Sequence, residues 1–239
     1  MYNGRVDASP TKYHPPLRRP GQKTLERLLT AAEQQLREED LDAFTIQNVL
    51  ARTDLSVGAF YSRFPDKNAL LHTVQQRMHQ RLEPKIMAGL AAQARVEESL
   101  EEAVDHGFGI LIENVLEEQA LTRAFMMRSV FDPVMRAKGE QVNVAREAAM
   151  TVFLMRYRDE IGHEDPELAI NAAYAMYSTV LRGRLVYFEA ASELERGVSD
   201  DTIFSLLTWT LGRYLRGSNN GSASLPFLTR PGEPPAPLT

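Results

Sequence analysis

The stretch from residue 45 to 71 limits the fold more than any other part of the chain. Its sequence, TIQNVLARTDLSVGAFYSRFPDKNALL, predicts two short helices joined by a tight turn and followed by a third helix. Ile46, Val49 and Leu50 recur at the spacing of one helical face, and Thr45 before them is a good N-cap. Two such helices form a helix-turn-helix unit, whose second helix can enter the major groove of DNA.

The second helix of this stretch carries apolar and polar side chains on different sides. Ser56 is a good N-cap, and Phe60 and Phe64 form the side that we expect to be buried. Pro65 and Asp66 end this helix and begin the next one, because aspartate also caps helices well. The periodicity alone also fits any small helical hairpin. The side chains expected on the open side are Val57, Ala59, Tyr61, Ser62 and Arg63.

The residue types resemble the DNA-binding domain of TetR-type (TetR/AcrR) transcriptional repressors. That family's pattern runs roughly T-[IV]-x-x-[IV]-A-x-x-A-G-[VI]-S-x-G-x-[LF]-Y-x-[YH]-F-x-[SD]-K-x-x-L. The chain departs from it at three places: Leu50 replaces a small alanine, Thr53-Asp54 replaces an Ala-Gly turn, and Arg63 takes a position that is usually aromatic. The residues that match without a gap are Thr45, Ile46, Val49, Ser56, Gly58, Phe60, Tyr61, Phe64, Asp66, Lys67 and Leu70, and Leu55 is a similar apolar residue where the pattern has Val or Ile.

The resemblance implies which groups would meet DNA. Ser56 caps the helix at this surface, and Gly58 would lie where the helix presses against the DNA. The groups implied to contact phosphates are Thr45, Tyr61 and Lys67. The groups implied to face base edges are Val57, Ala59, Ser62 and Arg63, although any of these could touch the DNA backbone instead.

The N-terminal residues 1–20 contain four prolines and no helical period, which predicts a disordered extension. Five basic residues and one acidic residue lie between positions 1 and 23, whereas the whole chain has a net charge of −5. Two interpretations stay open: a solvated tail, or a basic arm that follows the phosphates through Arg18 and Arg19. Lys23, at the start of the next predicted helix, could also reach a phosphate.

Composition excludes some classes of protein. The chain has 239 residues, 44% hydrophobic and 25% charged, which is ordinary for a soluble globular protein. It has no cysteine, so it can form neither a disulfide nor a thiolate metal site. No apolar run approaches the roughly 18 residues needed to cross a bilayer, and no signal-peptide core is present. We therefore expect a cytoplasmic protein without membrane contact.

Helical periods continue along the rest of the chain, so the expected fold is all-α. One predicted helix ends near Pro84, and a later one begins at Pro166 with Asp165 as its cap. The expected parts are a disordered basic extension over 1–20, a helix-turn-helix DNA-binding domain over 21–67, a larger helical regulatory and dimerisation domain over 68–216, and a disordered tail over 217–239.

The last predicted helix, 200–215, is apolar around much more than one stripe. One neighbouring helix cannot bury all of these side chains, so a second packing partner is implied. The resemblance implies a homodimer through the last two long helices, a palindromic operator in double-stranded DNA, and a small-molecule effector held among the central helices. The candidate effector contacts are Asn114, Phe125, Met127, Phe131, Phe153 and Tyr177. The alternative for Asn114 is an internal hydrogen bond, and for the others it is ordinary core packing.

The sequence thus predicts a transcriptional repressor released from its operator by a small apolar or amphipathic ligand. We expect no enzymatic activity, no cofactor and no metal. A helical metal-dependent enzyme is one alternative, and it would need Glu-x-x-His pairs on facing helices. His72 and His79 are expected to be exposed polar residues rather than metal ligands. The other alternative is a dimer of the same fold that has lost DNA or ligand binding.

Overall fold

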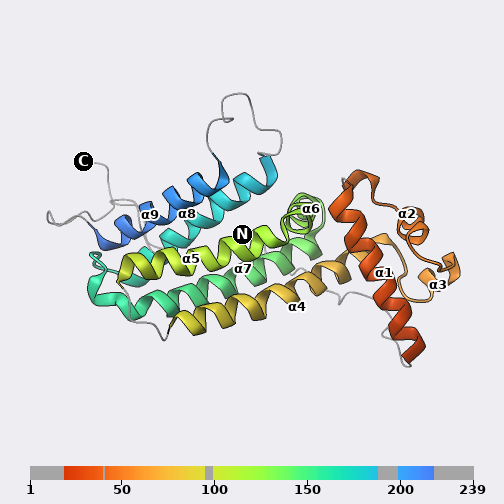
Figure 1. Ribbon diagram of the computed structural model, residues 1–239, viewed down its shortest axis with the longest axis horizontal. Coiled ribbons are helices and arrows are strands. Elements are labelled where there is room, and N and C mark those ends of the chain that lie inside the picture. The colour runs from red at the N-terminus through yellow and green to blue at the C-terminus, as the bar shows by residue number, and fades with distance from the viewer. Residues whose placement is uncertain (1–18, 40, 95–98, 188–198, 218–239) are drawn as a thin grey trace, which may run out of the picture. The chain divides into compact units, whose positions relative to one another are not determined.

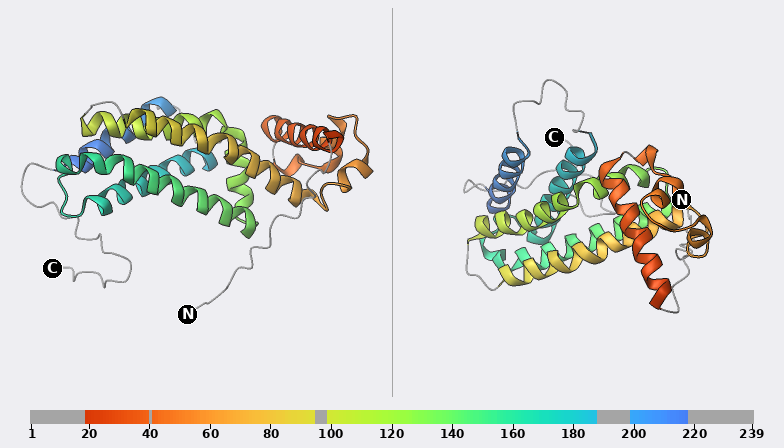
Figure 2. Two further views of the ribbon diagram at one scale, coloured as in Figure 1. Left: turned by 90° about the horizontal axis from the view of Figure 1, so that it is seen from below. Right: turned by 45° about the vertical axis from the view of Figure 1, so that its right-hand side comes forward.

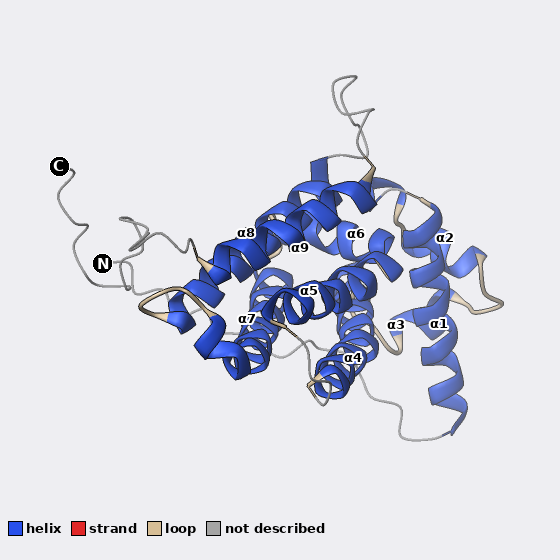
Figure 3. Ribbon diagram, turned by 60° about the vertical axis from the view of Figure 1, so that its left-hand side comes forward, coloured by secondary structure: helices blue, strands red, loops and turns tan. Residues whose placement is uncertain are grey.

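The computed structural model describes residues 19–39, 41–94, 99–187 and 199–217 (Figure 1). Every regular element in these ranges is a helix (Figure 3), which confirms the predicted all-α fold. The long helices are α1 (Arg19–Glu38), α4 (Lys67–Gln93), α5 (Leu100–Glu117), α6 (Gln119–Ser129), α7 (Pro133–Leu154), α8 (Pro166–Tyr187) and α9 (Asp200–Arg216). The short ones are α2 (Ile46–Ala51), α3 (Val57–Tyr61) and the 3-10 helices η1 (Leu41–Ala43) and η2 (Met155–Glu160).

The helices form two compact units. The first unit comprises the chain up to Pro84 together with residues 117–142, and the second comprises 85–116 with the chain from Asn143 onward. The first unit therefore includes α6 and the start of α7 in addition to α1, α2 and α3. The boundary predicted after residue 67, between the DNA-binding domain and the regulatory domain, stays a prediction. The two units are defined by packing and not by what their helices bind.

The core of the first unit holds α3 in place. Phe60 of α3 and Phe64 just after it are each 0% exposed, as predicted, and their ring centroids lie 5.7 Å apart. Burying one such side chain contributes about 1.5–3 kcal/mol relative to leaving it exposed. An apolar stripe of α1 joins the same core through Leu28, Leu29, Ala32 and Leu36.

Three side chains fix where the helices of the helix-turn-helix region begin. Thr45 caps α2, Ser56 caps α3 and Asp66 caps α4, and all three caps were predicted from the sequence. In each case the side-chain oxygen accepts a hydrogen bond from the backbone N–H three residues later, over 2.8–3.2 Å. Replacing such a cap with alanine typically costs about 1 kcal/mol.

Helix α4 continues through Pro84 to Gln93, so the predicted end of this helix near Pro84 is wrong. A proline inside a helix removes one hydrogen bond and costs about 3 kcal/mol. The following turns bury Ile86 and Leu90, which are 0% and 5% exposed. Each of these side chains contributes about 1.5–3 kcal/mol on burial. Packing in the second unit therefore offsets the effect of the proline.

The second unit is built from the end of α4, α5, the second half of α7, α8 and α9. Helices α8 and α9 lie side by side in it (Figures 2 and 3). Phe108 of α5 packs on Tyr177 of α8, with ring centroids 5.1 Å apart. Gly107 lets α5 approach α7, because a Cβ at this position would lie 2.9 Å from the ring of Phe153.

The later helix boundaries follow local capping. Asp165 caps α8, which begins at Pro166 as predicted. Asp132 caps α7 in the same way by accepting a hydrogen bond of 3.0 Å from the third residue after it. Helix α7 ends at Leu154 and gives way to η2.

Candidate DNA-binding surface

One side of α3 is exposed, and it is the side predicted to face DNA. Val57 and Tyr61 are 57% and 54% exposed, and Gly58 between them is exposed as well. Tyr61 stands edge-on to the buried Phe60, with ring centroids 5.2 Å apart. Ala59 is half-buried. Exposed valine and tyrosine on a helix whose other side is fully buried are typical of a binding surface.

The capping hydroxyls of Thr45 and Ser56 keep a proton to donate. Each uses its oxygen as an acceptor for a backbone N–H, at 3.1 Å for Thr45 and 3.2 Å for Ser56. A hydroxyl group that accepts one hydrogen bond can still donate another. Both residues are exposed, so each is able to cap its helix and to donate to a DNA phosphate at the same time.

Lys67 lies close to the start of α2 in space. Its Nζ donates a hydrogen bond to the backbone carbonyl of Phe44 at 3.2 Å, and Phe44 directly precedes Thr45. An ammonium group has three donors, so two remain for a phosphate. The structure thus brings together Lys67 and Thr45, two of the residues predicted to contact phosphates.

Ser62 and Arg63 differ in how their polar groups are used. Ser62 Oγ donates to the carbonyl of Ala59 at 2.8 Å, so its hydroxyl is left to act as an acceptor. Arg63 is half-buried, and its Nε makes no hydrogen bond within the described part of the chain. Ser62 is therefore suited to accept from a base amino group, whereas the Nε of Arg63 is buried and is not a donor toward DNA.

The turn between α2 and α3 is held by side chains at three successive positions. Arg52 pairs with Glu39, the residue that follows α1, at 2.6 Å. Thr53 Oγ1 donates to the carbonyl of Leu50 at 3.0 Å and accepts from the N–H of Leu55 at 3.3 Å. Asp54 is the third, and it forms an ion pair with α1. The turn that departs from the TetR-type pattern is therefore polar and tied to α1.

The predicted N-terminal arm is described only in part. Arg18 lies outside the described residues. Helix α1 begins at Arg19, so the predicted extension over 1–20 overlaps the start of this helix. Pro20 is compatible with a first helical turn, where no backbone N–H needs a partner. Lys23 is exposed near the start of α1, as a phosphate contact requires.

A cluster of charges, here called the ion network, joins α1, α4 and the start of α6. Arg81 donates to Glu33 at 2.7 Å and to Glu118 at 2.9 Å, and Arg37 donates to Glu118 at 2.6 Å. Burial raises the pKa of Glu118, but the hydrogen bonds from Arg37 and Arg81 outweigh it and hold that pKa below its usual value. Sequence reasoning missed this network, because no local pattern connects Glu118 to residues of α1.

The two histidines of α4 are not exposed, so that prediction is wrong. The side chains of His72 and His79 are 15% and 13% exposed. His72 Nε2 lies 2.7 Å from Asp132 Oδ2, which ties α4 to the start of α7. His79 lies 3.7 Å from Glu83, one turn later on the same helix. Helix α4 contacts α1 through Arg81 and α7 through Gln75, and these contacts shield polar residues on it from solvent.

The residues predicted to line an effector pocket fall in both units: Phe125, Met127 and Phe131 in the first, and Asn114, Phe153 and Tyr177 in the second. In the first unit Phe125 is 3% exposed, Met127 is exposed, and Phe131 is 81% exposed. In the second unit Phe153 and Tyr177 are buried in the core. Asn114 Nδ2 donates to the carbonyl of Ile110 at 2.8 Å, which is the internal hydrogen bond given above as the alternative.

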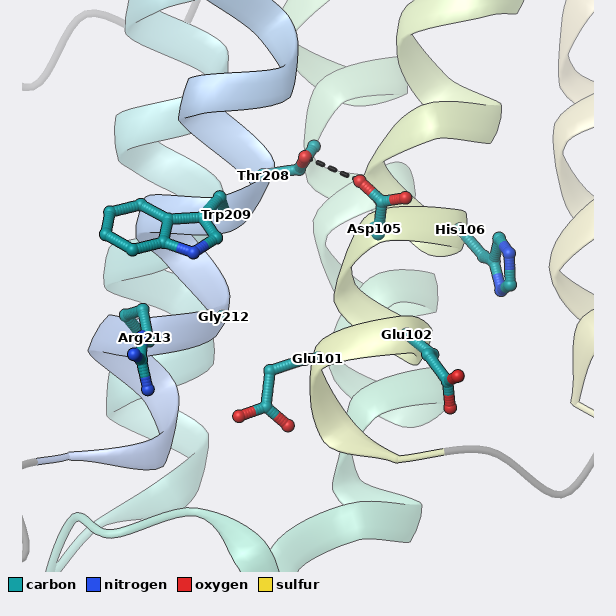
Figure 4. Close-up of a pocket in the computed structure, with 8 residues that line it drawn as sticks. All are labelled: Glu101, Glu102, Asp105, His106, Thr208, Trp209, Gly212 and Arg213. Atoms are coloured by element: carbon teal, nitrogen blue, oxygen red, sulfur yellow. Dashed lines mark hydrogen bonds between the residues drawn. The ribbon is translucent and has the colours of Figure 1, made fainter.

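A groove runs between α5 and α9 in the second unit, and we call it the α5–α9 groove (Figure 4). It consists of two hollows of about 340 and 490 Å³, both lined by Asp105, His106 and Thr208. Asp105 Oδ1 accepts a hydrogen bond from Thr208 Oγ1 at 2.6 Å. Trp209 lines the smaller hollow, and the Arg213 guanidinium lies 5.7 Å from the centre of its ring. The six residues predicted for the pocket do not line these hollows.

Within the described ranges, no group of three or more histidine, cysteine, aspartate or glutamate side chains is placed to hold a metal ion. Glu160 and His163 do have the Glu-x-x-His spacing. However, Glu160 accepts a hydrogen bond from Arg216 at 3.1 Å, and His163 Nε2 lies 2.6 Å from the carbonyl oxygen of Tyr214. None of the described helices is both long enough and apolar enough to cross a membrane.

Residues 28–74 match the family model described as bacterial regulatory proteins, tetR family. The fold is similar to that of a transcriptional regulator from Rhodococcus sp. Rha1, with a TM-score of 0.60 at 16% identity over 79% of this chain and 94% of that one. It is also similar to a protein from Mesorhizobium loti assigned to the TetR family, with a TM-score of 0.64 at 15% identity over 83% and 98% of the two chains.

A bacterial regulatory protein of the tetR family from Rhodococcus RHA1 has a TM-score of 0.60 at 17% identity, over 82% of this chain and 99% of that one. No curated protein sequence matches the chain. At these identities the solved structures show the fold alone, whereas the family model covers the helix-turn-helix region itself. The resemblance predicted from residues 45–71 is confirmed: the chain carries the DNA-binding domain of the tetR family of bacterial regulatory proteins, within the fold of TetR-family regulators.

Proposed function

We propose that this protein is a transcriptional repressor that leaves its operator when a small apolar or amphipathic ligand binds. The observation that supports DNA binding most directly is the exposed side of α3, held over a core in which Phe60 and Phe64 are fully buried. A rigid helix with exposed Val57 and Tyr61 is suited to the major groove. The repressor role and the ligand follow from the resemblance to the family.

The proposed contacts divide into two classes by chemistry. Thr45, Tyr61 and Lys67 would bind phosphates and set the position of α3 on the duplex, with Lys23 and the N-terminal Arg18 and Arg19 as further contacts. Ser56 would donate from its capping hydroxyl. Val57, Ala59, Ser62 and Arg63 would face base edges, with the backbone of Gly58 closest to the DNA.

We also propose a homodimer formed through α8 and α9. Leu206 and Trp209 of α9 are 59% and 61% exposed, and Met176 of α8 is 41% exposed. Large apolar side chains on neighbouring helices favour a protein interface, and aromatic residues are common at such interfaces. A two-fold dimer would bind a palindromic operator whose half-sites lie about one helical turn apart, or a multiple of it.

The effector has two candidate locations. One is the part of the sequence-predicted set that lies in the second unit, Asn114, Phe153 and Tyr177, with Asn114 as its polar member. The other is the α5–α9 groove, whose apolar and polar groups fit the usual composition of a small-molecule site. A ligand releases a repressor only if it binds the DNA-incompetent arrangement more tightly than the competent one. Either location would therefore have to differ between the two arrangements.

Selection of bound duplexes from a random pool, repeated with candidate ligands, tests these proposals together. We expect a palindromic sequence to be enriched, and one ligand class to abolish the enrichment. Asn114→Leu should abolish ligand release with operator binding intact if the sequence-derived location is right. Asp105→Asn should do so if the groove is the site, and Glu164→Gln, in the exposed loop before α8, serves as a control. No enrichment by the unmodified protein would contradict the proposed function.

A further inference from the structure

Arg27 of α1 and Asp54 of the turn before α3 form an ion pair within the first unit. Arg27 Nη2 donates to Asp54 Oδ2 at 2.7 Å, and the two side chains are 50% and 92% exposed. Arg27 follows Lys23 by one helical turn, so both side chains lie on one face of α1. Asp54 stands shortly before Ser56 and Val57 in the chain. The ion pair therefore borders the surface that carries the proposed DNA contacts.

An exposed aspartate is unusual at such a place. Where the TetR-type pattern has an uncharged Ala-Gly turn, this chain has Thr53-Asp54. A carboxylate next to DNA is repelled by the phosphates, whereas a guanidinium is attracted. The guanidinium of Arg27 can thus donate to either of two anions of similar geometry: the carboxylate of Asp54 or a phosphate of bound DNA.

We infer that Arg27 is a further phosphate-binding residue and that Asp54 competes with the phosphate for its guanidinium. This inference rests on the proposed function. In the free protein Asp54 holds the guanidinium, and on DNA binding a phosphate takes its place. Because the exchange involves the DNA backbone and no base, Asp54 lowers the affinity for every duplex to the same extent.

The expected size of the effect follows from how weak exposed ion pairs are. Such pairs contribute little to stability, and the corresponding change in DNA affinity is about 1.5- to 5-fold. A phosphate contact also releases counterions, which makes it favourable at low salt. The phosphate is therefore the stronger acceptor, and the ion pair reduces affinity without preventing binding.

A double-mutant cycle tests this competition. The full-length protein and its Asp54→Asn, Arg27→Gln and double variants are titrated with a fluorescent duplex of random sequence at several salt concentrations. Asp159→Asn is the matched control, because Asp159 also pairs with an exposed arginine, Arg158 at 3.6 Å, but lies in the second unit. Circular dichroism at the titration temperature checks that each variant is folded.

We expect Asp54→Asn to raise the affinity about 1.5- to 5-fold. Arg27→Gln should lower the affinity and reduce the salt slope by about one unit. In the Arg27→Gln background the gain from Asp54→Asn should be smaller, because only the repulsion between the Asp54 carboxylate and the phosphates remains, and Asp159→Asn should match the unmodified protein throughout.

Two results would overturn the inference while leaving the proposed function intact. One is an unchanged affinity and salt slope for Arg27→Gln. The other is the same gain from Asp54→Asn with and without Arg27, which would mean that Asp54 only repels DNA. An unmodified protein that binds no duplex at low salt would instead contradict the proposed function itself.

Discussion

The carboxylate of Glu118, at the N-terminal end of α6, accepts a hydrogen bond from the guanidinium of Arg37 in α1 over 2.6 Å. The same carboxylate accepts from Arg81 of α4 at 2.9 Å. Helix α1 supports the helix-turn-helix unit, so this one side chain connects α6 to the helices that would carry DNA contacts. A movement of α6 would therefore also displace α1 within the first unit.

Replacing Glu118 should destabilise the protein. Glu118→Gln removes a charge that is 12% exposed and leaves the hydrogen bonds to Arg37 and Arg81 weakened. We expect a loss of about 1–3 kcal/mol in the free energy of unfolding, the range for hydrogen bonds to charged groups and partly buried ion pairs. The urea midpoint at neutral pH measures it, with the exposed Glu167→Gln as the control. Equal midpoints for both variants would show that the network contributes nothing.

The contribution of Glu118 should depend on pH in one direction. Its folded-state pKa is lowered, so its stabilisation is present above the unfolded-state value of about 4.3 and is lost as the pH falls through the folded-state pKa. The difference in urea midpoint between the unmodified protein and Glu118→Gln should therefore be full at neutral pH and shrink in acid. A difference that grows on acidification would contradict this assignment.

Lys67 should bind DNA phosphate through its charge. Lys67→Gln keeps a donor for the Phe44 carbonyl but removes the charge, so it should weaken binding to all duplexes and flatten the salt slope by about one unit. Lys85→Ala in the second unit is the control. Titration of two unrelated duplexes across a range of salt concentrations gives both quantities. A variant that loses affinity for one duplex alone would show that Lys67 reads sequence instead.

Arg63 should read a base. Arg63→Ala should relax the preference at one position of each half-site by roughly 1–3 kcal/mol, because an arginine can donate two hydrogen bonds to one guanine. Selection from a random pool, compared position by position with the unmodified protein, detects this change. An unaltered preference with a uniformly lower affinity would move Arg63 into the phosphate-binding class.

Trp209 should be buried between two copies of the chain. Because its side chain is 61% exposed in one copy, Trp209→Glu should leave the fold intact and give a monomer with weakened operator binding. Phe131→Glu is a matched control, since Phe131 is 81% exposed but belongs to the first unit. Sedimentation velocity distinguishes the species. If the unmodified chain sediments as a monomer, the proposed dimer is wrong.

Sequence reasoning succeeded where a local rule decides the structure. The caps Thr45, Ser56 and Asp66 and the buried Phe60 and Phe64 follow from residue type and helical spacing. It failed at Pro84, because burial of residues further along α4 outweighs the local effect of proline. It also gave no means of telling Phe125, which is 3% exposed, from Phe131, which is 81% exposed.

Contacts between distant parts of the chain were the least predictable. His72 meets Asp132 and Arg37 meets Glu118, yet nothing in the spacing of these residues marks them as partners. Apolar side chains repeat along a helix and so reveal their shared face, whereas an ion pair between two helices leaves no repeat in either one. The α5–α9 groove was missed for the same reason, since Asp105 and Thr208 are joined only by the fold.

The most direct test of the central claim compares an enriched operator with a scrambled duplex of the same composition, using the unmodified protein and Val57→Glu. Val57 is exposed on α3, so the substitution changes the proposed DNA-facing side without touching the core. Binding constants at one salt concentration should favour the operator by at least about a thousandfold for the unmodified protein. The same preference should disappear in Val57→Glu. Equal binding of both duplexes by the unmodified protein, or an unchanged preference in Val57→Glu, would contradict the account.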